Sequence, residues 1–276
     1  MRKIGAFTLC VALLIGALSV SMTASAADVM LQYATGGAGT AWITGYTGDP
    51  VALGIPDKAG DWTVNGIGDA AFEGCQTLER VVLPDSVESI GIRAFADCPL
   101  LSDITLPDGV RHVGTDAFVG TAYYNEPANW TDHALYLDGV LLTVEAEAGD
   151  RFVVADDTKT IAQRAFINLP DLKAVILPAS LTYVDADALD GCDEAGLYMF
   201  ADATYAIEYA QASGRTYGVI ADLVKDGRVD MLDALILYNM ISKGTLPADM
   251  QYTADYDVNG TVNMMDCLQL YADISQ

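Results

Sequence analysis

The chain has 276 residues with 14 basic and 38 acidic side chains, and its formal net charge is −24. This length allows about one or two domains. Nucleic acid and anionic membrane surfaces repel so acidic a chain, which argues against both as partners.

Residues 1–26 have the pattern of a secretory signal peptide. Arg2 and Lys3 are a positive start, residues 4–19 are an apolar run, and Ala24-Ser25-Ala26 is a small-residue cleavage site. The run is shorter than the roughly 20 apolar residues that a membrane span needs, and no later stretch is longer. We therefore expect a secreted, extracellular protein with no membrane span.

The middle of the chain repeats every 23 residues. Ala-Phe pairs mark the period at Ala71-Phe72, Ala94-Phe95 and Ala117-Phe118, and it returns at Ala165-Phe166 and Ala188-Leu189. A second pattern, L-x-x-L-x-L, precedes a proline at residues 78–83, 101–106 and 172–177. This spacing is typical of the short strand of a leucine-rich repeat, and the proline ends the strand. Stacked units share one core, so the pattern predicts a solenoid.

Further residues recur at fixed places in the repeat: Ile90-Gly91, the cysteines at 75, 98 and 192, and the Leu-Pro pairs at 83–84, 106–107 and 177–178. Together with the Ala-Phe pairs, they resemble the BspA-like leucine-rich repeats of bacterial surface and secreted proteins. The resemblance covers residues 28 to 217. Residues 43–46 and 55–56 are interpreted as a degenerate first unit that caps the stack, and residues 205–212 as a helix before Gly214 that caps its other end. Residues 121–150 break the period and are interpreted as an interrupting hairpin. Its aromatic residues leave two interpretations open, a patch that binds a protein or sugar, or local packing: Tyr123, Tyr124, Trp130 and Tyr136.

No catalytic constellation is visible in the solenoid. No second histidine or cysteine stands at metal-ligand spacing from His112 or His133. We expect each histidine to lie on the surface or in an ordinary hydrogen bond. The mature cysteines are Cys75, Cys98, Cys192 and Cys267. Three of them occupy one repeat position, which favours free, packed thiols over disulfides.

A different pattern follows the repeats, a 12-residue loop from Asp255 to Asp266. Oxygen-bearing side chains stand at positions 1, 3, 5, 9 and 12, Gly260 is at position 6, and position 7 offers its backbone carbonyl. Calcium takes six to eight oxygen ligands from a loop of this spacing. The predicted ligands are Asp255, Asp257, Asn259, Thr261, Asn263 and Asp266.

A second copy of this loop lies upstream and begins at Asp222. Its predicted ligands are Asp222, Asp226, Arg228 through its carbonyl, Asp230 and Asp233. Val224 replaces the ligand at position 3, and Lys225 and Arg228 bring positive charge. Two interpretations stay open: a loop that binds calcium more weakly, with a water in place of the missing ligand, or a decayed loop that keeps only its turn.

Each loop leads into a helix with apolar spacing, and Gly244 ends the first one. The apolar residues are Leu232, Leu235, Ile236 and Met240, then Met265, Leu268 and Leu270. Two loop-helix units in residues 218–276 resemble a type I-like dockerin. The resemblance implies binding to a cohesin module of a scaffolding protein in a cellulosome, with partner contacts at Met231, Leu232, Met264 and Met265. The alternative is that some of these residues pack between the helices.

The sequence thus predicts a mixed fold: a signal peptide over residues 1–26, a mostly β leucine-rich-repeat solenoid over 27–217 and a small all-α, calcium-binding dockerin over 218–276. We interpret the chain as a non-catalytic interaction protein of a plant-polysaccharide-degrading bacterium, recruited to a scaffold at the bacterial surface. Its solenoid would bind a protein or a polysaccharide surface. The alternatives are a dockerin-borne polysaccharide-degrading enzyme and a cell-surface adhesin with a calcium-stabilised tail.

Overall fold

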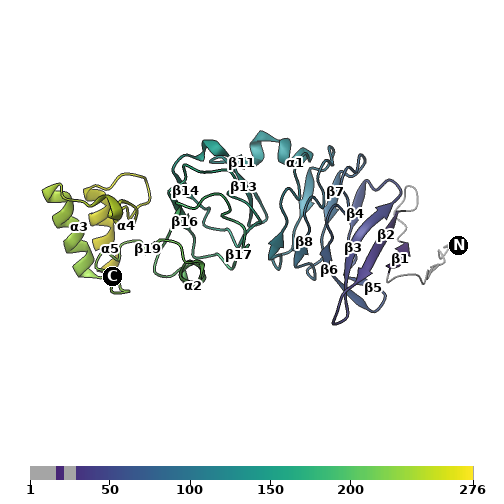
Figure 1. Ribbon diagram of the computed structural model, residues 1–276, viewed down its shortest axis with the longest axis horizontal. Helices are drawn as coiled ribbons and strands as arrows, with labels where there is room; N and C mark the ends of the chain where they lie inside the picture. Colours follow the sequence, from purple (N-terminus) through teal and green to yellow (C-terminus); the bar gives the residue numbers. More distant parts are fainter. Residues whose placement is uncertain (1–16, 22–28, 276) are drawn as a thin grey trace. The chain divides into compact units, whose positions relative to one another are not determined.

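The computed structural model describes residues 17–21 and 29–275 of the chain (Figure 1). The predicted signal peptide lies outside these residues except for 17–21, which form β1. Within the described part of the chain, no helix combines the length and apolar character needed to cross a membrane.

Contacts divide the chain into two compact units. The first runs to residue 144 and takes in 160–165 and 185–188; the second comprises 145–159, 166–184 and 189–276. The predicted domain boundaries at residues 26 and 217 therefore stay a prediction.

The first unit is almost entirely β-structure. Its elements are β1 (Ala17–Ser21), β2 (Met30–Thr35), β3 (Thr40–Thr47), β4 (Ala52–Gly54), β5 (Lys58–Ala59), β6 (Trp62–Ile67), β7 (Arg80–Val82), β8 (Ser89–Ile90), β9 (Asp103–Thr105), β10 (His112–Val113), α1 (Ala122–Asn125), the 3-10 helix η1 (Pro127–Asn129), β11 (Trp130–Thr131), β12 (Ala134–Leu137), β13 (Val140–Val144) and β15 (Thr160–Ile161). One sheet has the order β1-β2-β3-β6-β8-β10, with β5 beside β6, and a second has the order β4-β7-β9.

Each repeat places one strand in each of these two sheets, as β7 with β8 and β9 with β10 do. The strands pair in parallel with a shift of about one repeat, Val81 with Ile104 and Ile90 with Val113. The antiparallel pair β2–β3 begins the stack, in keeping with the expected first unit. The solenoid is thus built from short parallel strands, as the L-x-x-L-x-L pattern predicts.

The Ala-Phe positions form the central column of the core. Phe72, Phe95 and Phe118 are buried and stack in parallel with centroid distances of 5.0 and 5.4 Å. Their backbones also join neighbouring repeats, because Phe72 N–H donates to Ala94 and Phe95 N–H to Ala117. The expected inward packing of these pairs is confirmed.

The glycine that follows the second short strand of a repeat, in Ile90-Gly91 and Val113-Gly114, is required by close contact between repeats. A Cβ on Gly91 would lie 2.5 Å from the Asp69 nitrogen, and one on Gly114 would lie 2.4 Å from the Ile92 nitrogen. Those neighbours are backbone atoms, which cannot move aside. The stacking distance therefore depends on glycine at this position.

Three of the four cysteines that the structure describes, Cys75, Cys98 and Cys192, occupy the packed position that the repeat predicts. All four thiols are free and buried, and Cys98 and Cys192 donate to the carbonyls of Phe72 and Phe166. Burial raises the pKa of the Cys98 thiol to about 11. His112 pairs with the carboxylate of Asp185, in line with an ordinary structural role.

The expected hairpin is confirmed at β11–β12–β13, whose strands pair antiparallel. Its aromatic side chains are half-buried and bonded to one another's backbone. Tyr123 donates to the Tyr136 carbonyl at 2.6 Å, and the Trp130 indole donates to the Tyr124 carbonyl at 2.8 Å. These bonds support local packing rather than a binding patch.

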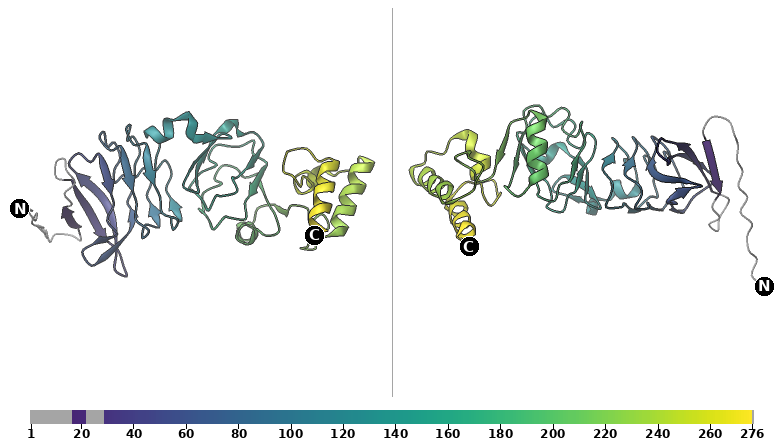
Figure 2. Two further views of the ribbon diagram at one scale, coloured as in Figure 1. Left: turned by 180° about the vertical axis from the view of Figure 1, so that it is seen from behind. Right: turned by 90° about the horizontal axis from the view of Figure 1, so that it is seen from below.

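The second unit joins the last repeats to the C-terminal region. Its elements are η2 (Ala146–Ala148), β14 (Arg151–Val153), β16 (Ala174–Leu177), β17 (Tyr183–Val184), β18 (Gly196–Met199), α2 (Thr204–Ser213), β19 (Tyr217–Val219), α3 (Met231–Lys243), η3 (Ala248–Met250), α4 (Gln251–Ala254) and α5 (Met264–Ile274). The strands β14-β16-β18-β19 form one parallel sheet. Helix α2 ends at Gly214 in the left-handed conformation, as expected for the capping helix, and α3 and α5 lie side by side (Figures 1 and 2).

Candidate functional site

The second predicted calcium loop lies between α4 and α5. The carboxylate of Asp255 accepts the backbone N–H groups of Asn259 at 3.2 Å and Gly260 at 2.8 Å. Gly260 has φ of 91°, a left-handed conformation that favours glycine. The carboxylate of Asp266 accepts the N–H groups of Asp257 at 3.2 Å and Asn263 at 2.7 Å. Asp255 and Asp266, both buried, thus hold the loop closed from its two ends.

The ligand spacing of both loops is also the signal that starts a helix. Asn263 is the N-cap of α5 and forms a capping box with Asp266, and Asp230 and Asp233 form the same box on α3. The side chain of each N-cap accepts a backbone N–H of the first turn. The last ligand of each loop is therefore fixed to the helix that follows.

The residues of the second loop fit a calcium ion. Within the described residues, one oxygen each from Asp255, Asp257 and Asp266 lies within 4.8 Å of the others. Burial raises the pKa of Asp266, and the N–H groups of Asn263 and Asp257 oppose that shift. Three carboxylate ligands with neither histidine nor cysteine match a hard divalent cation rather than zinc or copper. A bound calcium ion would supply the positive charge that brings these groups together.

The other predicted ligands of this loop are in place but hydrogen-bonded to one another. Asn259 Oδ1 accepts the Thr261 N–H at 2.8 Å, and Asn263 Nδ2 donates to the Thr261 carbonyl at 3.0 Å. The structure thus gathers three of the six predicted ligands. The assignment of Asn259, Thr261 and Asn263 stays a prediction.

The first loop has the same backbone framework with a weaker set of ligands. Asp222 accepts the N–H groups of Asp226 at 3.1 Å and Gly227 at 3.0 Å, and Asp233 accepts those of Leu223 at 2.8 Å and Asp230 at 3.0 Å. Half-buried Val224 stands at position 3. Among the described residues, only the second loop brings three carboxylates together. This difference favours a weaker first site, which stays a prediction together with the carbonyl of Arg228.

We expect Val224→Asp to tighten calcium binding at the first loop by at least about tenfold, because the number of charged ligands tunes the affinity of such loops. Calcium titration calorimetry of the mature protein should show the weaker site approaching the stronger one. Gln76→Asp, at an exposed position of the solenoid, adds a negative charge outside both loops and is the control. An unchanged weaker site in Val224→Asp would identify the first loop as a turn without an ion.

The helices that follow the loops present apolar side chains to solvent. The four predicted partner contacts are between 36% and 58% exposed: Met231, Leu232, Met264 and Met265. The alternative that they pack between the helices is wrong, because Ala234, Leu237, Cys267 and Leu270 fill that space. Leu235 and Leu268, which belong to the apolar spacing of the two helices, are also on the outside, since each is 55% exposed.

Two exposed tyrosines on these helices, Tyr238 and Tyr271, are not among the sequence-predicted contacts. Their separation in the sequence equals that between Asp222 and Asp255, the first residues of the two loops. The sequence repeat that relates the two loops continues into the helices after them, and comparing the two copies there could have identified these tyrosines.

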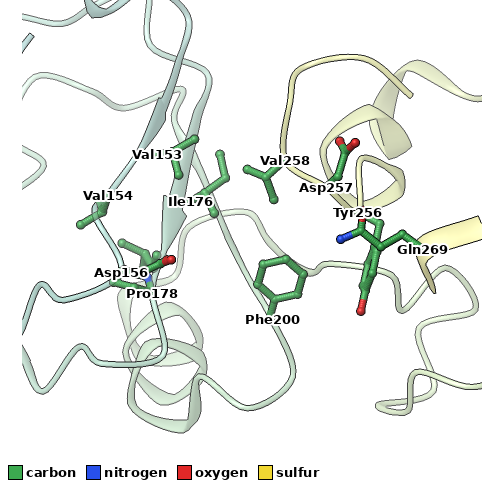
Figure 3. Close-up of a pocket in the computed structure, with 11 residues that line it drawn as sticks. Val153, Val154, Asp156, Ile176, Pro178, Phe200, Tyr256, Asp257, Val258 and Gln269 are labelled. Carbon is green, nitrogen blue, oxygen red and sulfur yellow. The ribbon is translucent and has the colours of Figure 1, made fainter. Parts of the chain in front are cut away.

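The second loop also packs against the last strands of the solenoid. Tyr256 and Val258 contact a buried cluster that contains Ile176, Tyr198 and Ile220, and the Phe200 ring meets the Tyr256 ring edge-on at 5.8 Å. Four of the side chains at this contact also line a pocket, in which Val258 and Tyr256 lie opposite Ile176 and Phe200 (Figure 3). Arg151, on β14, forms an ion pair with Asp255. One loop of the pair is therefore tied to the solenoid.

Comparison with protein families identifies two regions of the chain. The BspA type Leucine rich repeat region matches residues 61–126 and 149–210 in six copies, and the Dockerin type I domain matches residues 220–275. The chain therefore contains BspA-type leucine-rich repeats and a type I dockerin domain, as the sequence predicts. Both kinds of domain are non-catalytic. Type I dockerins generally bind calcium, and a dockerin implies cohesin binding and cellulosome-type assembly.

Solved structures with a similar arrangement are bacterial leucine-rich repeat proteins. The T. pallidum protein TpLRR is 26% identical, with a TM-score of 0.38 over 68% of this chain and 95% of that one. A protein from Bacteroides ovatus is 21% identical, with a TM-score of 0.33 over 61% and 45%. One from Bacteroides capillosus is 22% identical, with a TM-score of 0.30 over 65% and 97%. No curated protein matches the chain.

Proposed function

We propose that this protein is a secreted, non-catalytic interaction protein that joins a cohesin-bearing scaffold through its dockerin. The observation that carries the proposal is a set of eight large apolar side chains exposed on α3 and α5. They form four pairs, each related by the same sequence shift as the two loops: Met231 and Met264, Leu232 and Met265, Leu235 and Leu268, Tyr238 and Tyr271. Exposed apolar patches of this kind mark protein contact surfaces.

The pairs make two equivalent docking faces, one on each helix. The loops repeat with the same spacing as the exposed residues, and Cys267 of α5 contacts Ala234 of α3, the residue 33 positions earlier. A rotation that exchanges the helices therefore exchanges the faces as well. A cohesin that fits one face fits the other in the reversed orientation.

Calcium makes these faces available by ordering the helix starts. In each unit the last carboxylate of the loop also caps the helix, at Asp233 and Asp266. The face begins at the residues just before this carboxylate, so loop and face share one turn of backbone. Loss of calcium leaves buried carboxylates without a cation, which disfavours the closed loop.

Binding of the dockerin to the scaffold recruits the solenoid, and the proposed role of the solenoid is to bind a protein or a polysaccharide surface. Its strands and the residues just before them present charged side chains in pairs, such as Arg80 with Asp103 and Lys173 with Asp150. The competing roles, a polysaccharide-degrading enzyme or a surface adhesin, are distinguished by the experiment below.

A calcium-dependent pull-down with the whole mature protein tests the proposal. Immobilised cohesin modules should retain the protein in millimolar calcium and release it in excess chelator. Retention that is equal in chelator would overturn the calcium mechanism, and no retention on any cohesin would favour the adhesin. Release of soluble sugars from plant polysaccharides by the purified protein would replace the non-catalytic role with an enzymatic one.

A further inference from the structure

The solenoid contributes a cation to the second calcium loop. Arg151 lies on β14, far before the loop in the sequence, and its Nη1 forms an ion pair with Asp255 Oδ2. The arginine side chain is 16% exposed and the aspartate side chain 1%. Nη1 would also lie 3.5 Å from a Cβ placed on Gly260, so the guanidinium sits beside the turn of the loop.

The charges of the two loops show why a cation from outside matters here. The second loop, residues 255–266, has three aspartates and neither lysine nor arginine. The first, residues 222–233, has four aspartates, with Lys225 and Arg228 in the loop itself. Arg151 therefore provides to the second loop a positive charge that the first loop carries in its own sequence.

Packing holds the arginine in place rather than leaving it as a loose surface pair. Tyr256 and Val258, on either side of Asp257, contact the solenoid cluster around Ile176 and Phe200 (Figure 3). Val258 has φ of 57°, a conformation that a β-branched residue rarely adopts without tertiary support. The corresponding residues of the first loop are Leu223 and Lys225. Attachment to the solenoid is thus a property of the second loop.

We propose that Arg151 is a built-in competitor of calcium at the second loop. This inference rests on the proposed calcium binding. The guanidinium offsets repulsion among the three clustered carboxylates when no ion is bound, so it stabilises the ion-free loop. A bound calcium ion would face this positive charge nearby. Both effects lower the affinity for calcium, and by reciprocity calcium weakens the contact between the loop and the solenoid.

Calcium titration calorimetry of the mature protein tests this competition. Arg151→Gln should tighten calcium binding at one of two sites by about tenfold, within the usual range of coupling between linked sites. Arg151→Lys keeps the charge and should stay close to wild type. Lys173→Gln is the matched control, because it removes an exposed cation that stands just before strand β16 of the same sheet and pairs with Asp150. It should leave both sites unchanged.

The outcomes separate this inference from the proposed function. Equal or weaker calcium binding in Arg151→Gln, or equal tightening in Lys173→Gln, would overturn the competition while leaving calcium binding intact. Calcium binding in none of the proteins would overturn both.

A measurement on the wild-type protein does not depend on the folding of any variant. Calcium should speed hydrogen exchange in the segment that contains Arg151, because the ion weakens the contact. Slower exchange in this segment would show that calcium tightens the junction, contrary to the proposal.

Discussion

A glutamate placed on both dockerin faces, as Leu235→Glu with Leu268→Glu, should reduce cohesin affinity by more than about a hundredfold. Either substitution alone should leave most of the affinity. The two leucines occupy equivalent places on α3 and α5 and are equally exposed. A buried, unpaired carboxylate would disable the face that carries it, and the partner would then use the other face.

The substitutions are designed to spare the fold. Glutamate is a good helix former, and position 235 and position 268 point to solvent. They also follow the last loop ligand by two residues, so neither replaces a predicted calcium ligand. Calorimetry with a cohesin module in saturating calcium measures the affinity, and calcium binding by the same proteins reports whether the loops are intact.

The matched control adds the same charge elsewhere, as Gln76→Glu with Gln211→Glu, at two exposed positions of the solenoid. It should bind cohesin like wild type. Complete loss of binding in one single variant would mean that only that face is used. Normal binding by the double variant would show that cohesin does not contact these helix faces.

The solenoid could be predicted from sequence because its constraints are local and periodic. A repeat must present the same core side chains at each level, so Phe72, Phe95 and Phe118 recur with the period of the stack. The tight glycine at positions 91 and 114 recurs for the same reason. The calcium loop can also be predicted from sequence, since one short segment must supply most of the ligands around an ion.

The orientation of the dockerin helices could be predicted only in part. Apolar residues at helical spacing are typical of an inward face, and Leu235 and Leu268 satisfy that spacing while lying outside. The small residues Ala234 and Cys267 allow the helices to approach each other, which leaves the longer side chains in solvent. A docking face and a core stripe have the same periodicity, so only packing distinguishes them.

The junction at Arg151 could not be predicted from sequence at all. Its partner Asp255 is distant in the chain, and an isolated arginine near a strand is ordinary in an exposed repeat. The packing of Tyr256 and Val258 against the solenoid sheet brings the two groups together. Such contacts depend on how the last strands of the solenoid pack against the following domain, and a periodic sequence pattern does not specify that packing.

Removal of the central ring of the phenylalanine column, as Phe95→Ala, should lower the free energy of unfolding of the first unit by about 3–5 kcal/mol. Phe95 is fully buried and stacks on both Phe72 and Phe118. Each repeat of a solenoid is stabilised chiefly by its neighbours. A cavity in the middle of the column therefore weakens two interfaces, and the repeats on either side cannot close it because their backbones are already joined through Phe72 and Phe95.

Chemical denaturation followed by tryptophan fluorescence measures this effect selectively, since Trp42, Trp62 and Trp130 all belong to the first unit. The control Ile92→Ala changes a side chain of the same repeat that is 43% exposed, and it should shift stability by no more than about 0.5 kcal/mol. Similar small losses in both variants would mean that the phenylalanine column is not the main support of the stack. A large loss confined to Phe95→Ala is the result expected if coupling between repeats runs through these rings.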